Sequence, residues 1–296
     1  MIDLHIHSTY SDGTYNPIEL LQKAEKLGLE IISITDHESI DAHIELSNVN
    51  VEEYYRGKVI TGIELKTAYK SVPIEILGYG VNVEKIKKLM NIQQENKRKA
   101  QVKYLECLKN TGKKIGLKFD ENVQMSAEDF WAGLTFLNSI ERTEENREVI
   151  EKYNIGLSGD TFYRNCISNP NNIFYIDEEK DMLSPKEIIE EIHNAGGIAF
   201  LAHSLIYAWG DLPRQLEVVE EFINEYDIDG IECYHSLFST EGTEELLKLC
   251  DKYNLYKSGG SDYHGIDKPY IELGTGKENN LNISKDLVLE WINKIS

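Results

Sequence analysis

Short β-like runs alternate with helical segments along much of this chain, and this alternation narrows the folds that the chain can adopt. Strands are predicted at residues 3–7, 30–35, 59–65, 73–78, 198–202, 230–234 and 256–259, with helical patterns between most of them. Repeated strand–helix units bring parallel strands side by side, because each helix crosses over the face of the sheet. The sequence therefore predicts an α/β fold, either as a closed barrel or as an open sheet.

Capping signals mark the starts of two predicted helices. Asn16 can cap one helix, with Pro17 at its first position, Glu19 three residues after the cap and Gly28 at the expected end. The sequence Ser-Pro-Lys-Glu at 184–187 repeats this arrangement before a helix that ends at a glycine pair. In such a box the cap side chain accepts a hydrogen bond from a free backbone amide of the first turn.

The middle of the chain has a different pattern, because residues 84–180 are polar and mostly helical in character. Helices are predicted at 84–110, near 126–138 and near 143–153, and a strand at 173–176, with Gly112 just past the end of the first helix. We expect this block to be an inserted cap subdomain. Residues 1–83 and 181–296 would then form the main α/β domain.

The charge and the cysteines of the chain limit its partners and its location. The 296 residues carry a formal net charge of −20, which repels the phosphates of long nucleic acids, so no extended grip on DNA or RNA is expected. No apolar run reaches the roughly 18 residues of a membrane helix. Four cysteines without a Cys-x-x-Cys pair, and no signal-peptide pattern, predict reduced thiols and a cytoplasmic protein.

Histidines and acidic residues gather where the predicted strands end. His5 and His7 are two residues apart on a strand, so both side chains point to the same face. Similar side chains follow the other strands, and the full set is His5, His7, Asp12, His37, Glu64, His203, Asp262 and His264. Active sites of barrels and open α/β sheets lie at the carboxyl ends of the strands. We therefore expect these side chains to converge.

The chemistry of this set indicates a metal centre. A buried carboxylate costs several kcal/mol without a positive partner, and few lysines or arginines occur in these segments. Divalent cations would supply the charge, and imidazole nitrogen with carboxylate oxygen suits manganese, iron and zinc alike. Eight ligands are too many for one ion. The sequence therefore predicts two or three divalent metal ions.

The motifs that carry these residues resemble those of the PHP (polymerase and histidinol phosphatase) family. They are Asp3-Leu4-His5-Ile6-His7-Ser8 with Ser11-Asp12-Gly13, Thr35-Asp36-His37, Gly62-Ile63-Glu64, Leu201-Ala202-His203 and Ser261-Asp262-Tyr263-His264, in the family's order. Residues 192–197 and 230–235 resemble the stand-alone bacterial branch of the family. In that branch a helical insertion precedes the later strands.

The resemblance implies a distorted (β/α)7 TIM-like barrel with an inserted helical cap. It implies metal-ligand roles for the eight residues above, with Glu64 as a bridging carboxylate and manganese, iron or zinc as the metal. Glu75 stands where many relatives have a histidine, so it either ligates a third metal through oxygen or leaves that site weak. His235 matches a histidine that faces the substrate phosphate in relatives, and Arg164 aligns with a basic residue of their caps.

The resemblance further implies a hydrolase that cleaves a small phosphate ester with a metal-activated hydroxide. The metal ions and Arg164 would neutralise the phosphate, and His235, or a metal-bound water, would protonate the leaving group. The type of insertion favours a nucleotide (a nucleoside mono- or bisphosphate) or a short oligonucleotide end over histidinol phosphate, which is the alternative substrate. A metal-dependent amidohydrolase, which usually has a bridging lysine that is missing here, and a domain that only binds phosphorylated ligands are further alternatives.

Overall fold

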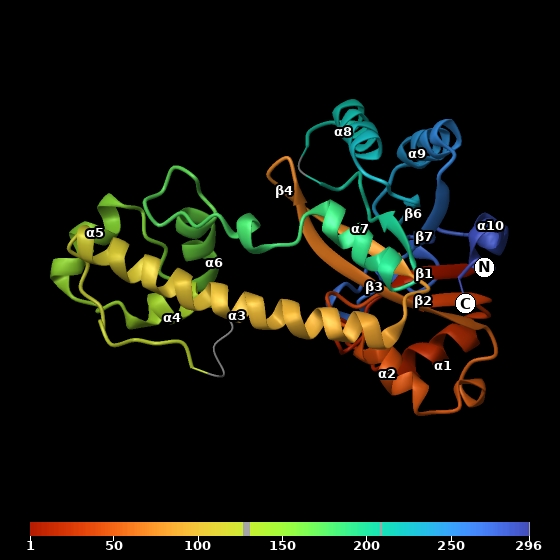
Figure 1. Ribbon diagram of the computed structural model, residues 1–296, viewed down its shortest axis with the longest axis horizontal. Helices are drawn as coiled ribbons and strands as arrows, with labels where there is room; N and C mark the ends of the chain where they lie inside the picture. The colour runs from red at the N-terminus through yellow and green to blue at the C-terminus, as the bar shows by residue number, and fades with distance from the viewer. Residues whose placement is uncertain (127–130, 208, 296) are drawn as a thin grey trace. The chain divides into compact units, whose positions relative to one another are not determined.

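The protein is built around a seven-stranded sheet, seen in a computed structural model that describes residues 1–126, 131–207 and 209–295. Its strands lie side by side in chain order (Figure 1). They are β1 (Ile2–Ile6), β2 (Ile31–Ile34), β3 (Lys58–Tyr69), β4 (Val72–Tyr79), β5 (Ile198–Leu201), β6 (Gly230–His235) and β7 (Tyr256–Gly260). A separate hairpin pairs β8 (Ile271–Glu272) with β9 (Gly276–Lys277).

Backbone hydrogen bonds between the first strand and the segment after the last one curl this sheet into a nearly closed barrel. The amide of His7 donates to the carbonyl of Tyr263, and the amide of Asp262 donates to the carbonyl of His5, both at 2.9 Å. Strands β1 to β3 are parallel to one another, and so are β5 to β7. The expected distorted, TIM-like α/β barrel is confirmed.

The direction of β4 corrects the expectation that the barrel strands are all parallel. It pairs antiparallel with both β3 and β5. Only Lys70 and Ser71 separate β3 from β4, and both have positive φ angles, 51° and 60°. A parallel partner needs a crossover of about a dozen residues, whereas a two-residue turn with positive φ joins antiparallel strands. The hairpin therefore reverses β4 inside an otherwise parallel barrel.

Helices that follow the strands pack their apolar faces against the barrel. They are α1 (Pro17–Leu27), α2 (Asp41–Ser47), α7 (Pro185–Asn194), α8 (Leu212–Glu225), α9 (Thr240–Tyr253) and α10 (Leu289–Ile292). Helix α7 contacts β3, β4 and β5, and its buried Ile188, Ile189 and Ile192 join the core cluster that also holds strand residues. The predicted capping boxes are confirmed in α1, at Asn16, and in α7, at Ser184.

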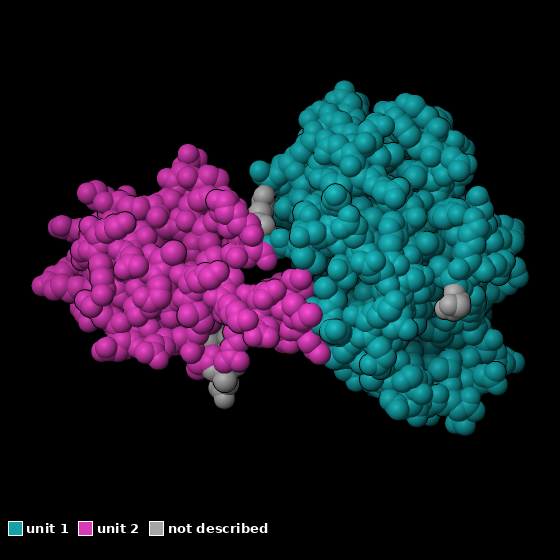
Figure 2. All heavy atoms as spheres, viewed as in Figure 1, with its two compact units in different colours: residues 1–90, 182–296 teal, residues 91–181 magenta. Residues whose placement is uncertain are grey.

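The described chain divides into two compact units, which Figure 2 shows in different colours. Unit 1 comprises residues 1–90 and 182–296, and unit 2 comprises residues 91–181. Helix α3 (Val83–Lys114) contains the boundary, whereas the sequence-based division at residue 83 marks the start of that helix. The helix also continues past Gly112, which was expected to lie beyond its end.

Unit 2 is mostly helical and has its own core. Besides its part of α3 it holds α4 (Ala132–Ser139), α5 (Glu144–Lys152) and α6 (Gly159–Phe162), which continues into a π-helical turn. The rings of Phe136, Phe162 and Phe174 lie 5.7 to 6.2 Å apart and are buried. The strand predicted at 173–176 is wrong, because this segment forms no ladder and instead inserts Phe174 into the core.

Two further sequence expectations concern helices. The helix predicted near 126–138 begins at Ala132, and residues 127–130 lie outside the described chain. No helix within the described ranges is long and apolar enough to cross a membrane.

Candidate metal centre

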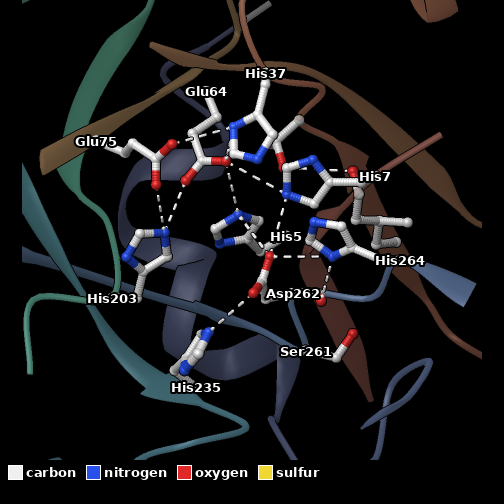
Figure 3. Close-up of polar contacts among 12 residues, drawn as sticks. His5, His7, His37, Glu64, Glu75, His203, His235, Ser261, Asp262 and His264 are labelled. Carbon is white, nitrogen blue, oxygen red and sulfur yellow. Dashed lines mark hydrogen bonds and ion pairs between the residues drawn. The ribbon is translucent and has the colours of Figure 1, made fainter. Parts of the chain in front are cut away.

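Each predicted site residue of unit 1 lies on a barrel strand or in the segment that follows one. His5 lies on β1 and Glu64 on β3, Glu75 lies on β4, and His235 ends β6. The remaining ones, His7, Asp12, His37, His203, Asp262 and His264, follow strands β1, β2, β5 and β7. Glu64 was expected to end its strand, but β3 continues to Tyr69. Figure 3 labels all of these residues except Asp12 and shows that the labelled side chains point toward one another.

One group of ligand atoms surrounds the junction of β1, β3 and the segment after β7. The Nε2 atoms of His5 and His7 each lie 3.4 Å from Glu64 Oε2. The same two atoms lie 3.5 and 3.2 Å from Asp262 Oδ1. All four residues are buried. Two imidazoles and two carboxylates therefore face one small volume, as the ligands of a metal ion do.

A second group shares Glu64 and includes Glu75. The Nδ1 atom of His37 lies 2.9 Å from Glu64 Oε2 and 3.3 Å from Glu75 Oε1. On the other side, His203 Nε2 lies 2.9 Å from Glu64 Oε1 and 3.2 Å from Glu75 Oε2. Glu64 thus presents oxygen atoms to both groups, which is the arrangement of a bridging carboxylate. Glu75 presents both of its oxygens to this second group.

A third group lies around Asp12, at the more exposed side of the centre. His264 Nε2 lies 3.2 Å from Asp12 Oδ1, and His37 Nε2 lies 3.7 Å from Asp12 Oδ2. His7 Nδ1 completes the group at 3.6 Å from Asp12 Oδ1. Asp12 keeps 57% of its side chain exposed, whereas the other carboxylates of the centre are largely buried. The structure therefore brings all nine predicted ligands together in three overlapping groups.

Several buried polar atoms in these groups make no hydrogen bond within the described chain. Four of them are Glu64 Oε2 and the three nitrogens 2.9 to 3.4 Å from it, His5 Nε2, His7 Nε2 and His37 Nδ1, which lack hydrogen-bond geometry; His203 Nδ1 is another. A buried polar atom without a partner costs roughly 1–3 kcal/mol, so a cluster of four calls for a missing partner. Divalent cations fit this role, because they accept lone pairs from imidazole nitrogen and carboxylate oxygen together.

The electrostatics of the groups agree with this interpretation. Burial lowers the pKa of His203, but hydrogen bonds to Glu64 and Glu75 outweigh burial and raise it to about 10. Burial likewise opposes charge on Glu64, yet His5 and the neighbouring histidines hold its pKa well below the usual value. Without metal, these shifts favour a proton on His203 beside an ionised Glu64, whereas burial lowers the pKa of His7. A metal ion would replace such a proton, because a ligating imidazole must be neutral.

The sequence model of the PHP domain matches residues 3–259 of this chain. The chain belongs to the PHP family. A 5'-3' exoribonuclease of Haemophilus influenzae is 28% identical to it over 295 residues, which cover 98% of this chain and 97% of that protein. A 3',5'-nucleoside bisphosphate phosphatase of Chromobacterium violaceum is 24% identical over 274 residues, covering 89% and 87%.

A solved structure supports the fold of this PHP protein over its whole length. A Bifidobacterium adolescentis protein assigned as a metal-dependent phosphoesterase superposes with a TM-score of 0.60 at 22% identity. The match covers 100% of this chain and 96% of that protein. Because the match includes residues 91–181, the inserted unit also has a counterpart there.

Sequence analysis missed a buried carboxylate that orients the PHP ligands. Glu232, in the middle of β6, accepts from His5 Nδ1 at 2.9 Å and from the backbone amide of His203 at 2.7 Å. The first bond places the proton of His5 on Nδ1, so that Nε2 presents its lone pair to the metal group. The sequence does contain a signal for Glu232, since it is a charged residue inside the apolar run of β6. It was missed because the predicted site residues were sought after strand ends, and Glu232 does not follow one.

Two neighbouring networks hold the loops that carry ligands. Asp36 accepts from the Ser8 amide at 2.7 Å and from the hydroxyls of Ser8 and Ser11 at 2.6 and 2.5 Å. Asp3 accepts from the amide of Ser261 at 2.9 Å and from its hydroxyl, next to Asp262. Each carboxylate thereby fixes a segment that carries a predicted ligand.

The backbone is strained at two of the ligands themselves. His203 and Asp262 have φ angles of 24° and 57°, which residues with a side chain rarely adopt. Such conformations persist where the surroundings hold them, and they occur most often at functional sites.

The two residues predicted to handle substrate lie in different settings. His235 is buried at the centre, with Nε2 3.6 Å from Asp262 Oδ2. Arg164 belongs to unit 2, where its exposed side chain donates from Nε to Asp160 at 2.8 Å. The role of Arg164 in holding phosphate stays a prediction.

Proposed function

We propose that this PHP protein is a metal-dependent phosphoesterase that hydrolyses a nucleotide, either a nucleoside mono- or bisphosphate or the end of a short oligonucleotide. The observation that carries the proposal is the convergence of buried imidazole nitrogens and carboxylates at one end of the barrel. Two relatives that match along almost their whole length are named for RNA and nucleoside bisphosphate substrates. The acidic surface favours small or short substrates over long nucleic acids.

The ligand groups assign the metal-binding roles in this proposal. His5, His7, Glu64 and Asp262 would hold one ion, and Glu64, Glu75, His37 and His203 a second. Asp12 and His264 offer a third position, which His37 would complete through Nε2 if it did not bind the second ion through Nδ1. When bound, divalent ions would polarise the phosphoryl oxygens and make water acidic enough to act as a nucleophile near neutral pH.

The remaining residues orient these ligands and move a proton. Glu232 keeps the proton of His5 on Nδ1, and the carbonyl of Asp262 accepts from His264 Nδ1 at 2.8 Å, so both Nε2 atoms present lone pairs. His235 Nδ1 accepts from the amide of Leu237 at 3.2 Å, which leaves its proton on Nε2. From that position His235 can donate to the leaving oxygen.

The test combines metal analysis with a panel of substrates. The purified protein is assayed for metal content by mass spectrometry, and for release of phosphate, or of mononucleotide from the trinucleotide, with and without added manganese. The panel holds adenosine 3',5'-bisphosphate, adenosine 5'-monophosphate, a 5'-phosphorylated trinucleotide, histidinol phosphate and an amide substrate. We expect at least two ions per chain and release from a nucleotide, with both lost in E64Q. Turnover of histidinol phosphate or of the amide alone would contradict the proposal.

A further inference from the structure

Asp262 presents its two carboxylate oxygens to two different sets of partners. Oδ1 faces the Nε2 atoms of His5 and His7 in the first ligand group. Oδ2 faces away from that group, toward Lys268 Nζ at 3.2 Å and His235 Nε2 at 3.6 Å. A lysine and a histidine therefore converge on the side of Asp262 that the first ligand group leaves open.

The histidine of this pair has an unused donor. His235 is 1% exposed, and its Nδ1 already accepts from a backbone amide, so the proton lies on Nε2. Within the described chain that Nε2 makes no hydrogen bond of normal length, and its recorded contact is an ion pair with Asp262 Oδ2 at 3.6 Å. A buried N–H without an acceptor points to a ligand that brings one.

Lys268 stands between two residues that the metal groups would use. Its ammonium donates to Asp262 Oδ2 and contacts His264 Nε2, both at 3.2 Å. A metal on His264 would take the lone pair of Nε2, so that atom would no longer accept a hydrogen bond from the lysine. The ammonium would then have a vacant donor beside Asp262, and an anion would supply the missing acceptor.

The metal centre is rich in carboxylates, and few lysines in the described ranges pair with them. The metal centre contains five carboxylates, those of Asp12, Glu64, Glu75, Glu232 and Asp262, and of these Lys268 contacts Asp262. In the described chain the ion pairs that join lysines to these carboxylates come from Lys268 and Lys66. Lys66 is 3.9 Å from Glu75 with 48% of its side chain exposed, whereas Lys268 is the more buried of the two, at 34%.

We propose that Lys268 is the cationic group that binds the substrate phosphate at this centre, beside His235, which the resemblance already predicts to face phosphate. The ligand class is a phosphate monoester or free phosphate, whose oxygens accept from both groups. This inference rests on the proposed function, because it names the group that positions the phosphate for the metal ions. Lys268 lies six residues beyond Asp262, outside the matched motifs, so the resemblance did not single it out.

The test measures phosphate binding and metal content on the same samples. Metal-loaded wild type, K268M, K268R and the control K252M are titrated with inorganic phosphate in a calorimeter, and their metal content is measured by mass spectrometry. Lys252 is exposed on α9 and pairs with Glu220, so K252M changes the net charge equally at a distant place. We expect K268M to bind phosphate roughly ten-fold or more weakly, the effect of losing a charge-assisted hydrogen bond.

The other variants show whether the loss of phosphate binding is specific to the charge at position 268. K268R should bind phosphate within about three-fold of wild type, since it keeps the charge, and K252M should match wild type. Equal binding by K268M and wild type would overturn the proposal. So would a changed number of metal ions in K268M, which would make the lysine a counter-ion of the ligands. If K268M does not fold, K268Q takes its place with the same two measurements.

The design separates this inference from the proposed function. If wild type cleaves nucleotides and K268M shows an unchanged KM, the function stands and the role of Lys268 falls. If wild type cleaves no phosphate ester but binds phosphate through Lys268, the subsite stands and the proposed function falls.

Discussion

Glu232 is a buried side chain that positions two predicted metal ligands, His5 and His203, without being a predicted ligand itself. Its two oxygens accept from the ring of His5 and from the backbone of His203, so it holds both residues in position. Burial opposes its charge, but the neighbouring histidines, His5 first, keep the pKa of Glu232 below the usual value. The carboxylate therefore stays ionised and makes the His5 ring a better donor to a metal.

Replacing this carboxylate tests its orienting role. E232Q keeps the size of the side chain but removes the charge, so we expect metal affinity to fall roughly 10- to 100-fold. Competition with a fluorescent chelator measures the affinity, and E272Q, an exposed change on β8, serves as the control. Unchanged affinity in E232Q would show that His5 is oriented without Glu232.

Replacing Glu75 tests which residues make up the second ligand group. Because its oxygens face His37 and His203 at 3.3 and 3.2 Å, we expect E75A to bind one metal ion fewer than wild type. E75H should restore the ion through a nitrogen ligand. Mass spectrometry after gel filtration counts the ions, with E52A as an exposed control. The same count in E75A and wild type would remove Glu75 from the ligand set.

At the scale of the elements, local signals predicted helix starts better than strand directions. The capping boxes at Asn16 and Ser184 are readable because each depends on residues three positions apart. The reversal of β4 depends on Lys70 and Ser71, which are not residue types that mark a two-residue hairpin. The spacing held a signal that was missed, because the seven residues 66–72 between the two predicted strands are too few for the crossover that a parallel pair needs.

The same reasoning explains which parts of the site were found. Ligands next to strand ends follow from the topology of parallel sheets, and the structure brings them together. Glu232 lies inside a strand, and Lys268 follows a short helical turn (Gly265–Asp267), so neither has that signal. Their roles depend on contacts with Asp262, His5 and His203 that only the folded chain shows.

The N-terminal cap of α7 leads to a prediction about the stability of the protein. The Ser184 hydroxyl accepts from the amide of Glu187, at the start of a helix that packs on β3, β4 and β5. We expect S184A to lower the free energy of unfolding by about 1 kcal/mol, measured by urea denaturation with saturating metal. S47A is the control, because its hydroxyl bonds a carbonyl inside a helix end. Equal midpoints for S184A and wild type would contradict the role of the cap.

At the scale of the whole molecule, the two units have separate cores. The predicted metal ligands all come from unit 1, whereas Arg164, which was predicted to contact the substrate, lies in unit 2. The core of unit 2 is built from its own aromatic side chains, including Phe136, Phe162 and Phe174. Metal binding should therefore stabilise unit 1 directly, because its ligands come from segments spread from His5 to His264.

This division predicts how the molecule responds to metal removal. A ligand that binds only the folded state stabilises it by about 2.7 kcal/mol at a free concentration 100 times its Kd. We therefore expect a chelator to lower the melting temperature of a calorimetric transition that belongs to unit 1 and to leave a second transition in place.

F136A, which removes a buried ring from unit 2, should destabilise the second transition by roughly 3–5 kcal/mol and leave the metal content unchanged. A single transition that moves with both changes would show that the units unfold as one.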